Sequence, residues 1–173
     1  MRLAKLIEEY INDQGWINEE VERDEEDNTS SYTTSLSVAN QSFRLFIESD
    51  EDKDLLFIYL YAPFSVIAGK SVDTALFFNF LNDTYIFGGR IYVKDDGRIC
   101  YKAIVDVENV EPPVAIIDNM LVSAMNLYSR HIESIAAVAL TQKTYEALRE
   151  EYDKKDAAKE AIKKSKEAEE SEE

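Results

Sequence analysis

Hydrophobic residues along the chain follow two different spacings, and the change between them marks the first elements. The first run recurs at helical spacing and ends before Gly15, a residue typical of helix ends; its apolar members are Leu3, Leu6, Ile7, Tyr10 and Ile11. From Ser31 the spacing changes to two, and apolar residues alternate with small or polar ones to Val38 and again from Phe43 to Ile47. The pattern predicts a helix followed by two β-strands.

The third predicted strand differs from the first two because it is apolar at nearly every position. An acidic stretch, Glu48–Asp54, precedes it and is too densely charged to be anything other than a turn. Residues 55–61 then have the sequence LLFIYLY, which predicts a strand that is covered on both of its faces. We expect Pro63 to end this strand and the three strands to form an antiparallel meander.

The segment from Ser71 to Asn82 predicts a second helix whose apolar residues point in almost every direction. A helix of this kind must be buried all round, whereas one sheet covers only one of its sides. Two interpretations remain open: burial between the sheet and a third helix of the same chain, or an interface with a second copy or a partner protein. For the interface, the candidate contact residues are Val72, Phe77, Phe78 and Leu81.

The second half of the chain predicts a β-hairpin and a long helix. The sequence Asp95-Asp96-Gly97 lies between two alternating strands, and Pro112-Pro113 opens a helix with a broad apolar stripe that reaches Leu140. The predicted fold class is therefore α+β, in the order helix, three-stranded antiparallel meander, helix, β-hairpin, long helix. We expect residues 1–141 to form a single domain and residues 142–173 to form a charged extension, helical or disordered.

The charge of the chain excludes some classes of partner. Its 173 residues include 19 Lys and Arg against 35 Asp and Glu, which gives a formal net charge of −16. A charge of this size argues against a general nucleic-acid-binding protein and against docking on anionic lipid. Much of the excess acid lies in Glu19–Asp27, Glu48–Asp54 and the C-terminal extension, outside the predicted packed elements. It therefore favours solubility and, by steering, basic partners.

The polar motifs indicate no catalytic, cofactor-binding or metal-binding site. Asp50, Asp52 and Asp54 begin like a calcium loop, but the turn glycine that follows in such loops is missing. The single histidine, His131, and the single cysteine, Cys100, lack the neighbours that a zinc site or a catalytic pair needs. The N-terminal region has no uninterrupted apolar stretch, and no run is long enough to span a bilayer, so we expect a cytoplasmic protein.

Several of these features together resemble the YbjN-like family of bacterial sensory transduction regulators. The resemblance rests on Pro63, the apolar helix ALFFNFLN at 75–82, and the segment GGRIYVKDDGRICYKAIV at 88–105. It covers the chain from Met1 to Leu140 and leaves out the charged extension. It implies a fold similar to that of type III secretion chaperones, which are small acidic homodimers that hold extended segments of partner proteins. It implies no enzymatic activity and carries over no functional residue.

The sequence thus favours a non-enzymatic protein-binding module, chaperone-like or regulatory, that captures a segment of a partner protein and forms a homodimer. The sheet and the second helix would make the contact, and addition of the segment to a sheet edge is the natural mode. The alternative is a small-molecule sensor or regulatory domain with a ligand pocket between the sheet and the helices. We expect no nucleic acid, membrane, metal or cofactor as a partner.

Overall fold

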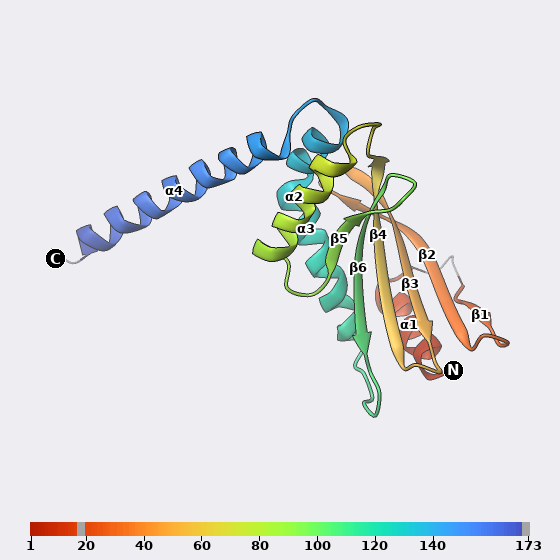
Figure 1. Ribbon diagram of the computed structural model, residues 1–173. Helices are drawn as coiled ribbons and strands as arrows, with labels where there is room; N and C mark the ends of the chain where they lie inside the picture. Colours follow the sequence, from red (N-terminus) through yellow and green to blue (C-terminus); the bar gives the residue numbers. More distant parts are fainter. Residues whose placement is uncertain (17–19, 171–173) are drawn as a thin grey trace.

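A computed structural model of the protein describes residues 1–16 and 20–170. In chain order the elements are α1 (Arg2–Asp13), β1 (Glu22–Asp24), β2 (Thr29–Val38), β3 (Gln41–Asp50), β4 (Leu55–Ser65), α2 (Ser71–Thr84), β5 (Arg90–Val93), β6 (Arg98–Asp106), α3 (Ala115–Leu140) and α4 (Tyr145–Glu170). The predicted α+β class and its order of elements are confirmed, with β1 and α4 as additions. Figure 1 shows a single sheet with α1 and α3 behind it and α2 at its side.

The six strands form one antiparallel sheet in the order β1-β2-β3-β4-β6-β5. Ala39 and Asn40 connect β2 to β3, and both have positive φ angles, as in the type I′ turn that matches the twist of a hairpin. The prediction that Pro63 ends the third strand is wrong. β4 continues to Ser65, and its pairing with β6 shifts in register after Tyr61, an irregularity that accommodates a proline.

Helices α1 and α3 pack against one face of the sheet, which we call the inner face. The side chains that the strands direct to this face are buried, among them Tyr32, Leu45, Ile58 and Tyr101. Tyr128 of α3 shows how closely helix and sheet meet. Its ring centroid lies 4.5 Å from that of Phe43, and its hydroxyl donates a 3.0 Å hydrogen bond to the backbone carbonyl of Leu60. Apolar burial of this kind supplies most of the stability of such a domain.

The acidic turn between β3 and β4 holds the start of α1 in place. Glu51 accepts hydrogen bonds from the backbone N–H groups of Arg2, Leu3 and Ala4, at 2.8, 2.7 and 3.0 Å. Its carboxylate therefore lies at the positive end of the helix dipole. Arg2 also forms an ion pair with Asp54 at 2.6 Å. This acidic segment thus contributes to the packing of α1 as well as to solubility.

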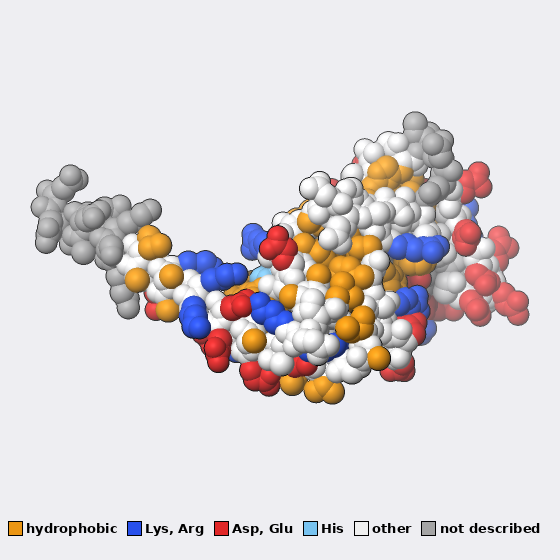
Figure 2. All heavy atoms as spheres, turned by 90° about the horizontal axis from the view of Figure 1, so that it is seen from above, with side chains coloured by type: hydrophobic (Ala, Val, Ile, Leu, Met, Phe, Trp, Pro, Cys, Tyr) orange, Lys and Arg blue, Asp and Glu red, His pale blue; other side chains and the backbone are white. Residues whose placement is uncertain are grey.

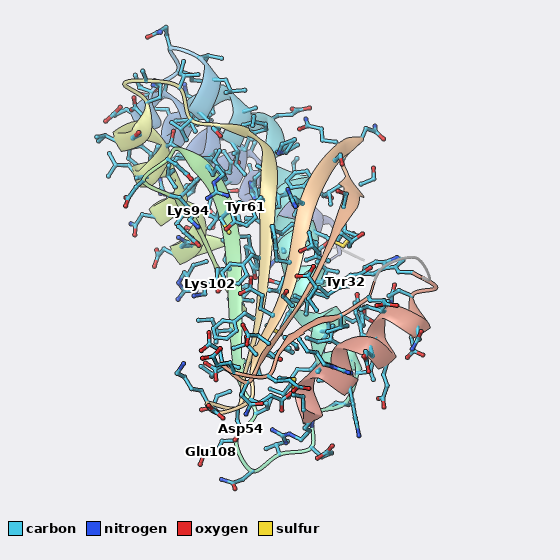
Figure 3. The ribbon with its side chains drawn as sticks, turned by 90° about the vertical axis from the view of Figure 1, so that its right-hand side faces the viewer. Tyr32, Asp54, Tyr61, Lys94, Lys102 and Glu108 are labelled. Carbon is cyan, nitrogen blue, oxygen red and sulfur yellow. The ribbon has the colours of Figure 1, made fainter. Side chains whose placement is uncertain are left out.

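The second face of the sheet has no helix packed on it within the described residues, and we call it the open face. Figure 3 shows Tyr61, Lys94 and Lys102 on this side of the sheet and Tyr32 on the other. The prediction that residues 55–61 are covered on both faces is therefore wrong. Alternate side chains of this strand are buried under the helices, whereas the aromatic side chains between them remain partly exposed.

Helix α2 closes one edge of the sheet. Asn82 donates one hydrogen bond to the backbone carbonyl of Ile91 and accepts another from its N–H, both at 2.9 Å. A sheet edge exposes unpaired backbone groups, and these two bonds satisfy them in the middle of β5. The opposite edge, formed by β1 and β2, receives no such cover from a described helix.

The apolar helix α2 packs against β5 and α3 on one side and against α4 on another. Leu148 and Tyr152 are only 1% and 8% exposed, and the ring of Tyr152 lies 5.7 Å from that of Phe77 on α2. Asp73 of α2 accepts a 3.0 Å hydrogen bond from the backbone N–H of Tyr145, which fixes the start of α4. The first turns of α4 therefore belong to the core, while its later part leads away from the body (Figure 1).

Charged side chains are distributed unevenly over the surface. In Figure 2, Asp and Glu side chains gather at the end of the molecule where β1 lies, and α4 carries both signs of charge. Within the described part of the chain, no helix combines the length and the apolar character that crossing a membrane requires.

Candidate functional site

The four residues predicted for a partner interface lie on α2 but differ in accessibility. Phe77, Phe78 and Leu81 are 0%, 1% and 0% exposed, because the sheet, α3 and α4 surround them. Val72 is 73% exposed near the start of the helix. In this conformation the three buried side chains cannot contact a partner, so their burial favours the internal-core interpretation. A binding surface has to be sought elsewhere.

The open face carries an unusual combination of aromatic and cationic side chains. It is built from alternate residues of four neighbouring strands, so that the strand register alone decides which side chains meet. Its aromatic and charged members from β3, β4, β6 and β5 are Arg44, Phe46, Glu48, Asp50, Phe57, Tyr59, Tyr61, Arg98, Lys102, Asp106, Arg90, Tyr92 and Lys94.

Cations and rings alternate across the strands of the open face. Arg44 lies directly opposite Tyr61, and Tyr59 lies between Phe46 on one neighbouring strand and Lys102 on the other. The guanidinium carbon of Arg44 is 5.2 Å from the centroid of Phe46, and the ammonium nitrogen of Lys102 is 5.2 Å from that of Tyr59. Contacts of this length are cation–π interactions, worth about 0.5–1 kcal/mol each at exposed sites.

A shallow hollow of about 360 Å³ lies in the upper part of this face. It is lined by Phe46, Glu48, Tyr59, Tyr61, Lys94 and Arg98. Burial raises the pKa of Glu48, although Lys102 and Lys94 act in the opposite direction. Burial also raises the pKa of Tyr59 to about 12, so its hydroxyl stays protonated at neutral pH. The hollow therefore offers ammonium and hydroxyl donors beside apolar ring surface.

The single cysteine lies beneath the open face. Cys100 points to the same side as Tyr61, its partner on β4, yet it is 0% exposed. Burial raises the pKa of its thiol, and hydrogen bonds with Tyr92 and Tyr61 act in the opposite direction. A buried thiol with a raised pKa is a poor nucleophile. Cys100 thus supports the aromatic side chains above it.

The edge strand beside the open face has a free stretch of backbone. β1 pairs with β2 only at residues 29–31, and on the side of β2 away from β3 no described strand pairs with residues 33–37. In a hairpin with a two-residue turn, the pair that closes the turn, here Val38 and Gln41, is hydrogen-bonded. Hydrogen-bonded and non-hydrogen-bonded pairs then alternate along the strand, so the N–H and C=O groups of Thr33, Ser35 and Ser37 point away from β3. The side chains of these three residues belong to the open face and are short.

A second polar site lies where α3 meets α4. His131 is 7% exposed, its Nδ1 is 2.7 Å from the hydroxyl of Tyr152, and that hydroxyl is 3.2 Å from the hydroxyl of Ser134. Burial, and after it the positive charges of Arg130, Lys155 and Lys159, lower the pKa of His131 to about 4. The imidazole lines a cleft of about 410 Å³ with Tyr85, Arg130, Glu133, Ser134, Tyr152, Lys155, Asp156 and Lys159.

Chemically, the open face offers aromatic ring surface together with cationic donors. The described residues contain no group of three or more His, Cys, Asp or Glu side chains placed to hold a metal ion. The sequence did contain a signal for this face: Arg44 and Phe46, then Tyr59 and Tyr61, then Lys102, all at the period of two that puts residues on one side of a strand. The sequence did not show the pairing register of β3, β4 and β6, which brings these side chains together.

Comparison with known proteins places the chain in a family. Among curated proteins, no relative matches it. Among solved structures, it is similar to the Yersinia pestis type III secretion chaperone SycH, crystallised in complex with a stable fragment of YscM2. The identity is 13%, the match covers 78% of this chain and 98% of the SycH chain, and the TM-score is 0.45. The YbjN family model, described as "Putative bacterial sensory transduction regulator", matches residues 3–137, and the chain therefore belongs to the YbjN family.

Proposed function

We propose that this protein is a non-enzymatic binding module that captures an extended segment of a partner protein along β2 and over the open face. The observation that carries the proposal is the open face itself. One side of the sheet is left without a helix within the described residues, and Phe46, Phe57, Tyr59 and Tyr61 stay partly exposed there. Exposed aromatic clusters on soluble proteins mark contact surfaces. The family description, a regulator, accords with such a role.

The free stretch of β2 supports strand addition as the mode of capture. An added strand would receive hydrogen bonds from the outward backbone groups of Thr33, Ser35 and Ser37. Its alternate side chains would then extend over the short hydroxyl side chains of β2 toward the aromatic residues of β3 and β4. The other edge of the sheet is less available, because Asn82 already occupies the backbone of Ile91.

Substitution of Thr33 by proline tests this mode. The Thr33 N–H points away from β3, so Thr33→Pro removes a donor to an added strand without removing a bond of the β2–β3 ladder. We expect the variant to fold, with a melting temperature within a few degrees of the wild type, and to lose partners that co-purify with the wild-type protein from native cells. Retention of every partner by the folded variant would contradict strand addition at β2.

Homodimer formation is a separate part of the proposal. Val72 and Leu76 are 73% and 44% exposed on adjacent turns of α2, on the side turned away from the core. Figure 2 shows apolar side chains at the surface of this end of the molecule. A contact between two copies through this patch predicts that Val72→Glu yields a soluble monomer in light scattering. A wild-type protein that is monomeric at micromolar concentration would contradict the homodimer.

The cleft beside His131 favours a second candidate function, that of a small-molecule sensor. Donors from two helices converge there: Arg130 from α3, and Lys155 and Lys159 from α4. Such an arrangement suits a small anion and would link its binding to the position of α4. Native mass spectrometry of the protein purified under mild conditions tests this candidate. A bound mass that is lost in the Arg130→Gln variant would support it, whereas ligand-free protein would count against it.

A further inference from the structure

We infer that the partner segment is acidic, and this inference rests on the function proposed above. Positive charge gathers at one end of the open face in a chain whose net charge is −16, while the carboxylates Glu48, Asp50 and Asp106 lie toward the other end of this face. Five of the 19 Lys and Arg residues lie on the open face: Arg44, Arg90, Lys94, Arg98 and Lys102. The net charge alone suggested basic partners. The placement of the cations on the open face indicates instead that the segment bound there carries negative charge.

Most of these cations have no carboxylate partner of their own. Arg98 forms an ion pair with Asp96 at 2.7 Å. None of the other four takes part in an ion pair with a described residue, although the chain has 35 acidic residues. Three of the cations instead lie over aromatic rings: Arg44 over Phe46, Lys94 over Tyr61, and Lys102 over Phe57 and Tyr59. Glu48 is close enough to Lys94 and Lys102 for their charges to lower its pKa, but it forms no ion pair with either. Cations that rest on rings remain available to an incoming carboxylate.

The register specifies where a carboxylate of the segment would lie. On β2, Ser35 pairs with Arg44 and Thr33 pairs with Phe46. A strand added to β2 would lie about 9–10 Å from β3, a distance that a Glu and an Arg side chain span together across a short serine. The segment residue opposite Ser35 should therefore be acidic, and the residue opposite Thr33 should be apolar or aromatic to reach Phe46.

An acidic protein segment suits this surface better than a nucleic acid does. A polynucleotide carries one negative charge per nucleotide, so a protein of net charge −16 repels it more strongly than it repels a peptide with one or two carboxylates. Glu48, which borders the hollow of the open face, adds to this repulsion. A peptide strand needs only one or two carboxylates, and it also uses the outward backbone groups of β2. Ring surface between the cations suits the apolar side chains that alternate with those carboxylates.

Fluorescence anisotropy with three labelled ten-residue peptides tests the inference on the full chain. The peptides alternate Glu and Val, Gln and Val, or Lys and Val, so they differ only in charge. We expect the Glu peptide to bind at least about tenfold more tightly than the Gln peptide, the Lys peptide not to bind, and 0.5 M salt to remove the difference. Arg44→Gln should weaken binding of the Glu peptide severalfold, while Lys5→Gln, at an exposed position of α1 on the other side of the sheet, should leave that binding unchanged.

The result that overturns the inference is equal binding of the three peptides, no binding of any of them at millimolar concentration, or preference for the Lys peptide. Tighter binding of a twenty-residue oligothymidylate than of the Glu peptide would also overturn it. The proposed function is judged separately, by partner loss in Thr33→Pro. If that loss occurs and the captured segment proves neutral or basic, protein capture stands and the acidic preference fails.

Discussion

The pKa of His131 gives the sharpest quantitative prediction, because it is the single histidine of the chain. In the folded protein this pKa falls from the ordinary 6.5 to about 4, first through burial and then through the cations Arg130, Lys155 and Lys159. The folded state therefore binds fewer protons than the unfolded chain between these two pH values. Its contribution to stability is fully present above pH 6.5 and is lost as the pH falls toward about 4.

The magnitude follows from the size of the shift. One pKa unit corresponds to about 1.4 kcal/mol, so the full shift is worth about 3 kcal/mol, and about 2 kcal/mol of this should be lost between pH 7 and pH 5. These figures are upper limits because the cleft beside His131 is open to solvent. The chain has 35 acidic residues besides this histidine, so the pH dependence of the wild type alone does not isolate the contribution of His131.

The assay compares the wild type with His131→Asn by urea unfolding at pH 7 and pH 5. We expect the wild type to lose about 1–2 kcal/mol more than the variant between the two values. The NMR signals of the imidazole ring report its pKa directly, since no other histidine contributes. A folded-state pKa near 6.5, or the same loss of stability in both proteins, would refute the account of how α4 packs over α3.

Three further predictions concern packing. Phe77→Glu should abolish folding, because it places a charge at a fully buried site, whereas Val72→Glu should leave the fold intact; circular dichroism and thermal melts distinguish the two. Gly89→Ala should lower the free energy of unfolding in urea by about 1–3 kcal/mol, because the new Cβ would lie 2.5 Å from a buried ring and 2.7 Å from a backbone oxygen. Gly88→Ala is the control: the nearest atom to its Cβ would be 3.5 Å away, so it should lower the free energy of unfolding by less than about 0.5 kcal/mol. Cys100 should react with a thiol reagent only as fast as the protein unfolds, and a rapid reaction in native buffer would show that the rings above it open.

The elements of the fold were predictable from the sequence because each has a strong local signal. Helix α1 follows from its apolar spacing, and the β5–β6 hairpin follows from Asp95-Asp96-Gly97. The all-round apolar character of α2 also correctly required a second cover. The sequence could not show that α4 provides it, because Leu148 and Tyr152 are too thinly spaced to form an apolar stripe. The domain boundary at residue 141 therefore remains a prediction, although α4 begins inside the core.

The candidate site was harder to foresee, because it depends on contacts between distant residues. Alternation along one strand shows that Tyr59 and Tyr61 share a side, but only the register brings Lys102 from β6 beside them. The run at 55–61 was interpreted as covered on both faces, since nearly every position in it is apolar. Long cationic side chains provide part of that cover here. The ammonium nitrogen of Lys102 lies over the rings of Phe57 and Tyr59, 5.3 and 5.2 Å from their centroids.

Site-specific photo-crosslinking in cells tests whether the open face contacts a partner protein. A photoreactive amino acid replaces Tyr59 on the open face or, as the matched control, Asn126, which is exposed on the outer side of α3. We expect a discrete protein adduct from position 59, an extended acidic stretch at the crosslinked site of the partner, and no such adduct from position 126. Adducts of equal yield from both positions, or none from position 59, would contradict the claim that the open face of the sheet captures a partner.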